Sequence, residues 1–466
     1  MTVYNYNSSD LNHNIDLTDR EEFLLKKSKT FCIYPWTHIH AHPTGEAYPC
    51  CHAELGVGQV GNCREKSLEE IWNDQPMQKL RQDMLSETPN QACVRCYEQE
   101  NVGMRSARHS ANKHHGHHIK KLDTNPFELT YWDIRFSNLC NLKCRSCGHI
   151  FSSQWHGDQK KVLLTGYWNN VRDPSWPENP PMTFKQFEEL PKTIKDELTN
   201  RFGGEILRHL ETVKTLPALL YSGKTETDMW EQLEPHLDYV EQIYFAGGEP
   251  LLMEEHYRIL DELDRRKMYN VKLIYNTNFT HTNLKDKSVF DYWKKFSSVA
   301  VGASLDASGS RAEYIRKGTD WDTVEQNRKK MLQICPQVDF YISPTLSIMN
   351  AMHLPDFHRD WVEKGLIRAQ DININILQDP AHYRIDIAPA EYKRQLTELY
   401  QTHIGWIKSV GDPLGRATRG FKDAITFMNS DDKSRLINKF WVKTNELDKI
   451  RNENCIDIIP ELKALL

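Results

Sequence analysis

The spacing of apolar residues predicts strands in the middle of the chain and helices toward its end. Residues 131–136 alternate polar side chains with aromatic and β-branched ones, and residues 240–246 form a second apolar run of strand length. Toward the C-terminus, apolar residues recur at helical spacing, as in residues 392–400 and 421–427. We therefore expect an α/β core followed by a helical extension over residues 381–466.

Three cysteines follow the first of these strands in a single short loop. Cys140, Cys144 and Cys147 have the spacing C-x3-C-x2-C, which supplies three thiolates, enough for three corners of a cubane [4Fe–4S] cluster. Because such clusters usually have four cysteine ligands, the fourth iron would be open to another molecule. The alternatives are ordinary buried thiols and a structural zinc site, since His149 follows closely and zinc binds both cysteine and histidine.

A glycine-rich turn follows the second strand directly. It consists of Gly247, Gly248, Glu249 and Pro250. Two glycines let a backbone approach a ligand closely because neither has a Cβ, and a neighbouring carboxylate can accept hydrogen bonds from an ammonium group. Taken alone, the four residues could equally form an ordinary strand-to-helix turn.

Together, the cysteine loop and the GGEP turn, in that order and each after a strand, resemble the radical S-adenosylmethionine (radical SAM) superfamily. The resemblance implies an α/β fold with a partial (β/α)6 TIM-like barrel over residues 129–380, carrying an insertion at about 155–235. We interpret the insertion as a substrate lid, or else as simple decoration of the scaffold. The remaining strands of the barrel would be residues 271–278, 299–306, 338–346 and 372–377.

The same resemblance implies the cofactor sites. Cys140, Cys144 and Cys147 would ligate a [4Fe–4S] cluster, whose open iron would bind the methionine end of S-adenosylmethionine. Many members have an aromatic residue where this chain has Ser146, so the adenine contact must come from elsewhere, and residues 372–377 are our candidate. The predicted cofactor-binding residues are Gly247, Gly248, Glu249, Pro250, Asn276, Ser304, Asp306 and Arg316, and no catalytic residue is predicted.

These residues would have different roles toward S-adenosylmethionine. The two glycines and Glu249 would hold its amino group. Ser304 and Asp306 would lie near its ribose or its carboxylate, and Arg316 would pair with that carboxylate. Helix capping is the alternative role for Asn276, Ser304 and Asp306, because Asn, Ser and Asp are favoured at helix N-termini.

The first hundred residues contain a second group of cysteines, six of the 11 in the chain. The pieces PW, YPCC, GN and SLEEIW and a closing C-x2-C resemble the auxiliary iron–sulfur domain called SPASM, or its shorter form, twitch. In most relatives this domain follows the barrel, whereas here it precedes it. The resemblance implies one auxiliary [4Fe–4S] cluster, with a zinc ribbon as the alternative. The predicted ligands are Cys32, Cys50, Cys93 and Cys96, with Cys51 or Cys63 as substitutes for one of them.

Three further segments complete the predicted organisation. Residues 1–30 are polar, and we expect them to form a loose arm. Residues 31–105 would be the auxiliary domain. Residues 106–128 form a basic, histidine-rich connector, whose histidines we expect in an exposed linker or on a helix face rather than in a metal site.

Composition limits the classes of partner. The 39% hydrophobic content includes no apolar run long enough for a membrane span. A net charge of −5 gives no overall attraction to nucleic acid, although a local basic patch is compatible with it. No signal-peptide pattern opens the chain, so we expect a cytoplasmic protein.

The sequence therefore predicts a radical SAM enzyme, a function implied by the resemblance. Such an enzyme reductively cleaves S-adenosylmethionine to a 5′-deoxyadenosyl radical, which abstracts a hydrogen atom from the substrate. We expect a ribosomal peptide or protein as substrate, modified by oxidation, crosslinking or epimerisation, and flavodoxin or ferredoxin as reductant. The alternatives are a nucleotide, sugar or RNA substrate, and a non-catalytic iron–sulfur electron carrier, which would have no use for the GGEP turn.

Overall fold

The computed structural model describes residues 15–54, 56–101, 105–161, 191–193, 196 and 217–466. The insertion predicted at about 155–235, and with it the lid interpretation, lies mostly outside these residues.

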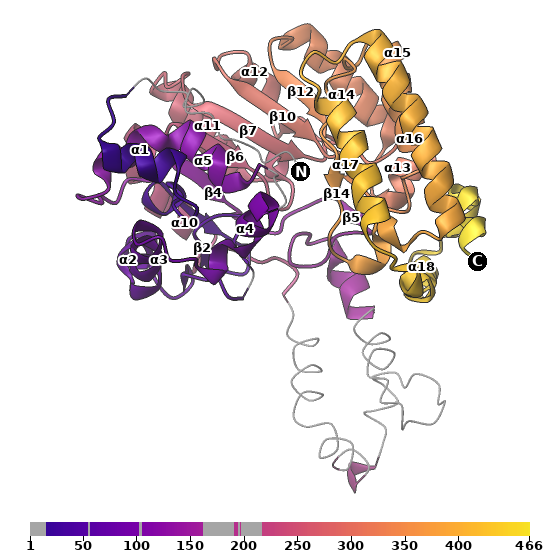
Figure 1. Ribbon diagram of the computed structural model, residues 1–466, viewed down its shortest axis with the longest axis horizontal. Coiled ribbons are helices and arrows are strands. Elements are labelled where there is room, and N and C mark those ends of the chain that lie inside the picture. The colour runs from indigo at the N-terminus through magenta and orange to yellow at the C-terminus, as the bar shows by residue number, and fades with distance from the viewer. Residues whose placement is uncertain (1–14, 55, 102–104, 162–190, 194–195, 197–216) are drawn as a thin grey trace.

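The described residues form an eight-stranded sheet with the order β12-β10-β7-β6-β4-β1-β2-β3 (Figure 1). Neighbours from β12 to β1 are parallel, as expected where helical crossovers link successive strands. An α/β fold with a large parallel sheet is therefore confirmed, while the (β/α)6 partial barrel stays a prediction. The parallel core strands are β4 (Tyr131–Ile134), β6 (Gln242–Phe245), β7 (Lys272–Thr277), β10 (Val299–Ala303) and β12 (Asp339–Ile342).

The fifth and sixth predicted strands are shorter than expected. Residues 338–346 divide into β12 and β13 (Thr345–Leu346), separated at Pro344, which has no N–H group to donate. Ile372 forms an isolated parallel bridge with Ile342, and β14 (Asn375–Ile376) pairs in parallel with β13. The sixth strand thus follows the fifth in space as well as in sequence.

Helices connect the parallel strands and bury one face of the sheet. Trp132, Ile243, Tyr275 and Phe340 lie on that face and are at most 3% exposed. The apolar positions recur at every second residue, which is the period of a strand. The connecting helices are α10 (Asp228–Leu233), α11 (Glu254–Arg265), α12 (Val289–Trp293), α13 (Gly309–Ile315), α14 (Trp321–Ile334) and α15 (Leu354–Glu363).

The N-terminal segment continues the same sheet. Strand β1 (His38–Ala41) pairs in parallel with β4 and antiparallel with β2 (Glu46–Tyr48), which in turn pairs with β3 (Gly61–Asn62). The predicted auxiliary domain therefore shares its sheet with the core. Its helices are α2 (Leu68–Asn73), α3 (Gln75–Leu85) and α4 (Val94–Asn101).

Residues 19–26 correct the prediction of a loose arm. They form helix α1 (Asp19–Lys26), which begins with a capping box between Thr18 and Glu21. Leu24 and Leu25 are each 3% exposed and pack into the core. The loose arm is therefore wrong for these residues, because the helix has both a cap and an apolar face.

The histidine-rich connector is helical but not exposed. It contains α5 (Ala107–His115) and η4 (Gly116–Lys121). Asn112 is 1% exposed; its Oδ1 accepts a hydrogen bond from the Ile33 N–H at 3.0 Å, and its Nδ2 donates to the Phe31 carbonyl at 3.2 Å. The expectation of an exposed linker is wrong, whereas its alternative, a helix face, agrees with α5. The segment is buried because Asn112 holds the backbone on both sides of Cys32.

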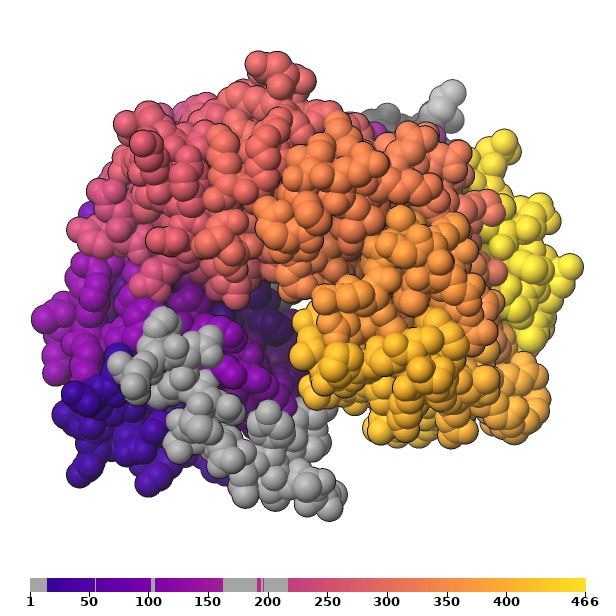
Figure 2. Space-filling model, turned by 90° about the horizontal axis from the view of Figure 1, so that it is seen from above, coloured from indigo at the N-terminus to yellow at the C-terminus, as the bar shows by residue number. Residues whose placement is uncertain are grey.

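The C-terminal extension is helical, as predicted. Figure 1 shows it at the opposite end of the sheet from the N-terminal segment, and in Figure 2 the two segments lie on opposite sides of the molecule. No helix among the described residues is both long and apolar enough to cross a membrane. The helices are α16 (Ala390–Val410), α17 (Arg416–Ser430), α18 (Ile437–Arg451) and α19 (Cys455–Ile458).

Short strands and 3-10 turns lie between the longer elements. The strands are β5 (Lys143–Cys144), β8 (Asn283–Leu284), β9 (Lys287–Ser288) and β11 (Arg316–Lys317), and the 3-10 turns are η2 (Tyr34–Trp36), η3 (Gln91–Cys93), η5 (Glu234–Tyr239), η6 (Pro250–Leu252), η7 (Ala381–Tyr383), η8 (Ile385–Ile387), η9 (Ser434–Leu436) and η10 (Pro460–Leu465).

Replacing Asn112 with alanine tests the fastening role of the connector. The substitution leaves the buried Ile33 N–H and Phe31 carbonyl without this partner, so we expect the free energy of unfolding to fall by about 1–3 kcal/mol. Urea unfolding followed by circular dichroism measures the change. Asn73→Ala, at an exposed helical position, is the matched control. Equal effects of the two substitutions would contradict the role.

Candidate functional site

The three cysteines of the loop after β4 converge on one cavity. Cys140, Cys144 and Cys147 all line it, and its volume is about 860 Å³. Strand β5, which contains Cys144, pairs antiparallel with β11, and Nη1 of Arg316 lies 3.7 Å from the Cys144 Sγ. Trp155 donates its indole N–H to the Cys144 carbonyl at 2.9 Å. Contacts from distant parts of the chain thus shape the loop.

The donor set fits a metal cluster. Burial raises the pKa of the Cys147 thiol to about 12, and burial also raises the pKa values of Cys140 and Cys144. These thiols would stay protonated in an empty site, whereas metal coordination deprotonates a thiol. Three thiols around one cavity would fit three irons of a [4Fe–4S] cluster and leave the fourth iron for another ligand.

The glycine-rich turn packs directly against the base of the cysteine loop. A Cβ on Gly248 would lie 2.1 Å from the Leu139 carbonyl oxygen, a distance that no side chain tolerates. The Glu249 N–H donates to the same carbonyl at 2.7 Å, and Gly247 has a φ of +118°. Glycine is therefore required at both positions, and the turn is fixed beside Cys140.

Glu249 is a buried carboxylate held by three donors. Its Oε1 accepts from the Thr277 hydroxyl at 2.7 Å and the Leu251 N–H at 3.1 Å, and its Oε2 accepts from the Asn278 N–H at 2.7 Å. Burial raises its pKa to about 7 in spite of these bonds. The predicted cofactor residues did not include Thr277 and Asn278, although the TN pair after the third strand was the signal for them.

Asp306 is held by contacts within the protein. It forms a bidentate pair with Arg316, at 2.8 Å to Nε and 2.9 Å to Nη2, and it accepts a hydrogen bond from the Thr345 N–H at 2.8 Å. Burial opposes the charge of Arg316, but Asp306 raises the pKa of its guanidinium. Asp306 therefore orients Arg316 toward the cysteine loop.

The structure brings most of the predicted cofactor residues together. The cavity lining among the described residues does not include Pro250, which begins η6, or Asp306. Ser146 and Leu377 also line the cavity, and Leu377 is the last residue of the segment 372–377 proposed for the adenine contact. The predicted residues that line it are Gly247, Gly248, Glu249, Asn276, Ser304 and Arg316, together with the three cysteines.

A second pocket gathers four cysteines of the N-terminal segment. Cys32, Cys50, Cys93 and Cys96 line it. Neither of the two predicted substitutes is part of its described lining: Cys63 is fully buried elsewhere, and the Cys51 thiol lies beside the Asp133 carboxylate. Four thiols around one pocket would fit the four irons of a closed [4Fe–4S] cluster.

A charged group between the two cysteine sites was missing from the predicted site. Asp133 on β4 is fully buried, 3.2 Å from Nδ1 of His40 and 3.0 Å from Nη2 of Arg135. Burial opposes its ionisation, but Arg135 and His40 hold the pKa of Asp133 well below its usual range. Arg135 lines the large cavity with its guanidinium 4.9 Å from the Tyr244 ring centre. The alternation along residues 131–136 could have predicted this pair, because it places Asp133 and Arg135 on the same face of the strand.

The C-terminal extension holds the cysteine loop from outside. Arg145 is 1% exposed at its side chain and pairs with Asp448 and with Glu453, whose Oε2 lies 2.6 Å from its Nη2. Its guanidinium also stacks on the Tyr314 ring at 3.7 Å, and the Tyr314 hydroxyl donates to Asp448 at 2.8 Å. The position of the loop therefore depends on α18.

A family model for SPASM, an iron–sulfur cluster-binding domain, matches residues 32–97. The match confirms the predicted SPASM domain and contains all four cysteines of the second pocket. An iron–sulfur cluster is thus the expected content of this pocket, and the zinc ribbon is disfavoured.

Matches among whole proteins are weaker. No curated protein matches the chain. Among solved structures, native anSMEcpe with bound AdoMet is similar, with 24% identity, a TM-score of 0.26, and coverage of 34% of this chain and 45% of that chain. TYW1 with a lysine-pyruvate adduct bound has 14% identity, a TM-score of 0.26, and coverage of 58% and 70%. This chain spans about half the length of the anSMEcpe structures. Scores this low support no argument about function.

Replacing Asp448 with alanine tests the support from α18. The change removes one partner of a buried ion pair, so we expect the free energy of unfolding to fall by about 3 kcal/mol. We also expect reconstituted protein to lose iron mainly from the cysteine loop. Chemical iron analysis after reconstitution measures this. Asp457→Ala, at an exposed position nearby, is the control and should retain its full iron content. Full iron retention in Asp448→Ala would show that α18 does not hold the cysteine loop in position.

Proposed function

We infer that this chain is a radical SAM enzyme with an N-terminal SPASM domain, and we propose that it modifies a ribosomally made peptide or protein. One observation supports this more than any other. A single cavity is lined by the C-x3-C-x2-C thiols, the two glycines and Glu249, residues that come from the ends of two neighbouring parallel strands. Ligands of α/β folds bind at the carboxyl ends of such strands.

Cys140, Cys144 and Cys147 would hold a [4Fe–4S] cluster, and the cavity beside them would hold S-adenosylmethionine on a partial barrel. When bound, these groups supply a 5′-deoxyadenosyl radical that abstracts a hydrogen atom from the substrate. The Glu249 carboxylate would accept hydrogen bonds from the ammonium group of S-adenosylmethionine. Thr277 and Asn278 already hold the Glu249 carboxylate in position, so little reorganisation would be needed on binding.

Arg316 would neutralise negative charge at the other side of the cavity. Asp306 holds its guanidinium in place, and its Nη1 faces the Cys144 sulfur. This orientation suits either the methionyl carboxylate or the cluster thiolates. Asn276 donates to the Tyr244 hydroxyl and so lies within the cavity wall.

The size and charge of the cavity support a substrate larger than a cofactor fragment. Its volume of about 860 Å³ is at the upper end of small-molecule pockets. Arg135, the residue directly after β4, lines the cavity, and its guanidinium could bind a carboxylate of a peptide there. SPASM enzymes often modify peptides, which is the reason for our choice of substrate class. An electron carrier would need no cavity of this kind.

The auxiliary site would exchange electrons with the substrate. Cys50 lines the auxiliary pocket, and the next residue, Cys51, lies beside Asp133, which pairs with Arg135 in the cavity wall. The two cysteine sites are thus connected through a few packed side chains. We propose flavodoxin or ferredoxin as the external reductant.

Iron content tests the two-cluster proposal. Anaerobically reconstituted protein should hold about eight irons, since each cluster has four. A variant with Cys140→Ala, Cys144→Ala and Cys147→Ala should retain about half. Iron and zinc analysis of both proteins measures this. Stoichiometric zinc with iron confined to one site would contradict the auxiliary cluster.

Replacing Glu249 with glutamine tests S-adenosylmethionine binding. The carboxylate would form a charge-assisted hydrogen bond with the ammonium group, and its loss should weaken binding about 10- to 100-fold while iron content stays unchanged. Dithionite-reduced protein should release 5′-deoxyadenosine, and the variant should do so only at higher S-adenosylmethionine concentration.

Glu255→Gln is the matched control for this experiment. Glu255 is 6% exposed, and burial raises its pKa, but the described cavity lining does not include it. It should bind S-adenosylmethionine as the unmodified protein does. Equal affinity in Glu249→Gln would mean that Glu249 only shapes the turn, and absence of 5′-deoxyadenosine in the unmodified protein would refute the enzyme.

A further inference from the structure

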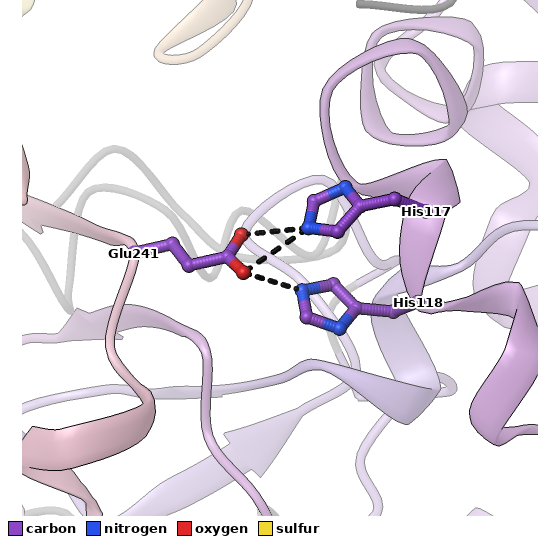
Figure 3. Close-up of side chains that lie close together, drawn as sticks. All are labelled: His117, His118 and Glu241. Carbon is purple, nitrogen blue, oxygen red and sulfur yellow. Dashed lines mark hydrogen bonds and ion pairs between the residues drawn. The ribbon is translucent and has the colours of Figure 1, made fainter. Parts of the chain in front are cut away.

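Three side chains meet at the end of β6 that lies away from the cysteine loop. Nε2 of His117 lies 2.9 Å and 3.1 Å from the two carboxylate oxygens of Glu241, and Nε2 of His118 lies 3.2 Å from Oε1 (Figure 3). The three ligand atoms all lie within 4.8 Å of one another. Both imidazoles point toward the carboxylate from the same 3-10 turn, η4.

We propose that His117, His118 and Glu241 bind Zn²⁺. Zinc takes nitrogen and oxygen ligands at about 2.0–2.2 Å in a tetrahedron, which separates ligand atoms by about 3.4 Å. The distances from Glu241 to the two histidine nitrogens, 2.9 Å and 3.2 Å, are close to that value, and all three ligand atoms lie within 4.8 Å, so side-chain movements would bring them around one ion. Imidazole and carboxylate without thiols favour zinc over an iron–sulfur cluster.

The surroundings of His118 support a metal over a simple ion pair. This residue is 6% exposed, and its Nε2 makes no hydrogen bond within the described part of the chain, although Glu241 lies 3.2 Å away. A buried nitrogen that lacks a well-aligned partner is costly. Binding zinc through its lone pair would satisfy it.

Backbone hydrogen bonds hold Glu241 in position before any ion binds. The Glu241 N–H donates to the Thr130 carbonyl at 2.8 Å, and its carbonyl accepts from the Lys272 N–H at 2.8 Å, so the residue is tied to both neighbouring strands. Its side chain is 44% exposed, which leaves room for water as the fourth ligand. The site would therefore clamp the connector to the sheet.

This role fits the position of the connector. The same segment contains Asn112, which holds the backbone just before and after Cys32, a predicted auxiliary ligand. A zinc ion at η4 would fix the far end of that segment against β6. The site lies at the end of the strand opposite Gly247, so its function would be structural and separate from the cavity.

Zinc titration of the cluster-loaded protein tests the proposal. Loaded clusters occupy the cysteines, so added Zn²⁺ should find the proposed site, with about one ion bound per chain. Isothermal titration calorimetry and elemental analysis after dialysis measure binding. Glu241→Gln and His118→Gln should each weaken it at least about tenfold, since even indirect partners of a metal ligand change affinity about 10–100-fold.

Two control variants make the result specific. His114→Gln changes a histidine of the same segment whose Nδ1 contacts the Ser110 carbonyl, and Glu234→Gln changes an exposed carboxylate on η5; both should bind zinc as before. Iron content and the circular dichroism spectrum should be unchanged in all four variants, which excludes misfolding as the cause. The absence of zinc binding by the unmodified protein, or equal affinity in all variants, would overturn the proposal.

Discussion

The close approach of Gly248 to the Leu139 carbonyl is the constraint on which the site depends. It fixes the turn after β6 against the start of the cysteine loop after β4, and the Glu249 N–H completes the contact. Any side chain at this position would force the two loops apart. The thiols and the carboxylate share one cavity because two backbones can touch here.

The cost of this arrangement is the burial of Glu249. A carboxylate without solvent is unfavourable unless donors surround it, and burial indeed raises its pKa to about 7. Thr277, Asn278 and Leu251 provide donors from the next strand end and from η6. Because these donors hold the carboxylate in one position, the ammonium group of the proposed ligand would meet a preformed acceptor. The end of the neighbouring strand would thus be part of the proposed binding site.

Local patterns predicted the features that depend on neighbouring residues, and missed those that depend on distant ones. The strands, the cysteine loop and the glycine turn follow from alternation and spacing. The Arg145–Asp448 pair and the approach of Glu241 to His117 join residues far apart in the chain, which no local pattern reveals. Helix α1 is different: its capping box between Thr18 and Glu21 is a local feature, but the prediction for residues 1–30 rested on polar composition alone.

The sheet explains how an auxiliary domain can precede the core instead of following it. Strand β4 has β6 on one side, and its other edge accepts β1 in parallel. A segment from either end of a chain could occupy that edge. Pairing at this edge sets His40 opposite Asp133, so the charged group between the two cysteine sites is a direct result of strand register. The contact between the N-terminal segment and the wall of the large cavity is therefore made by the sheet itself, whatever the order of the domains.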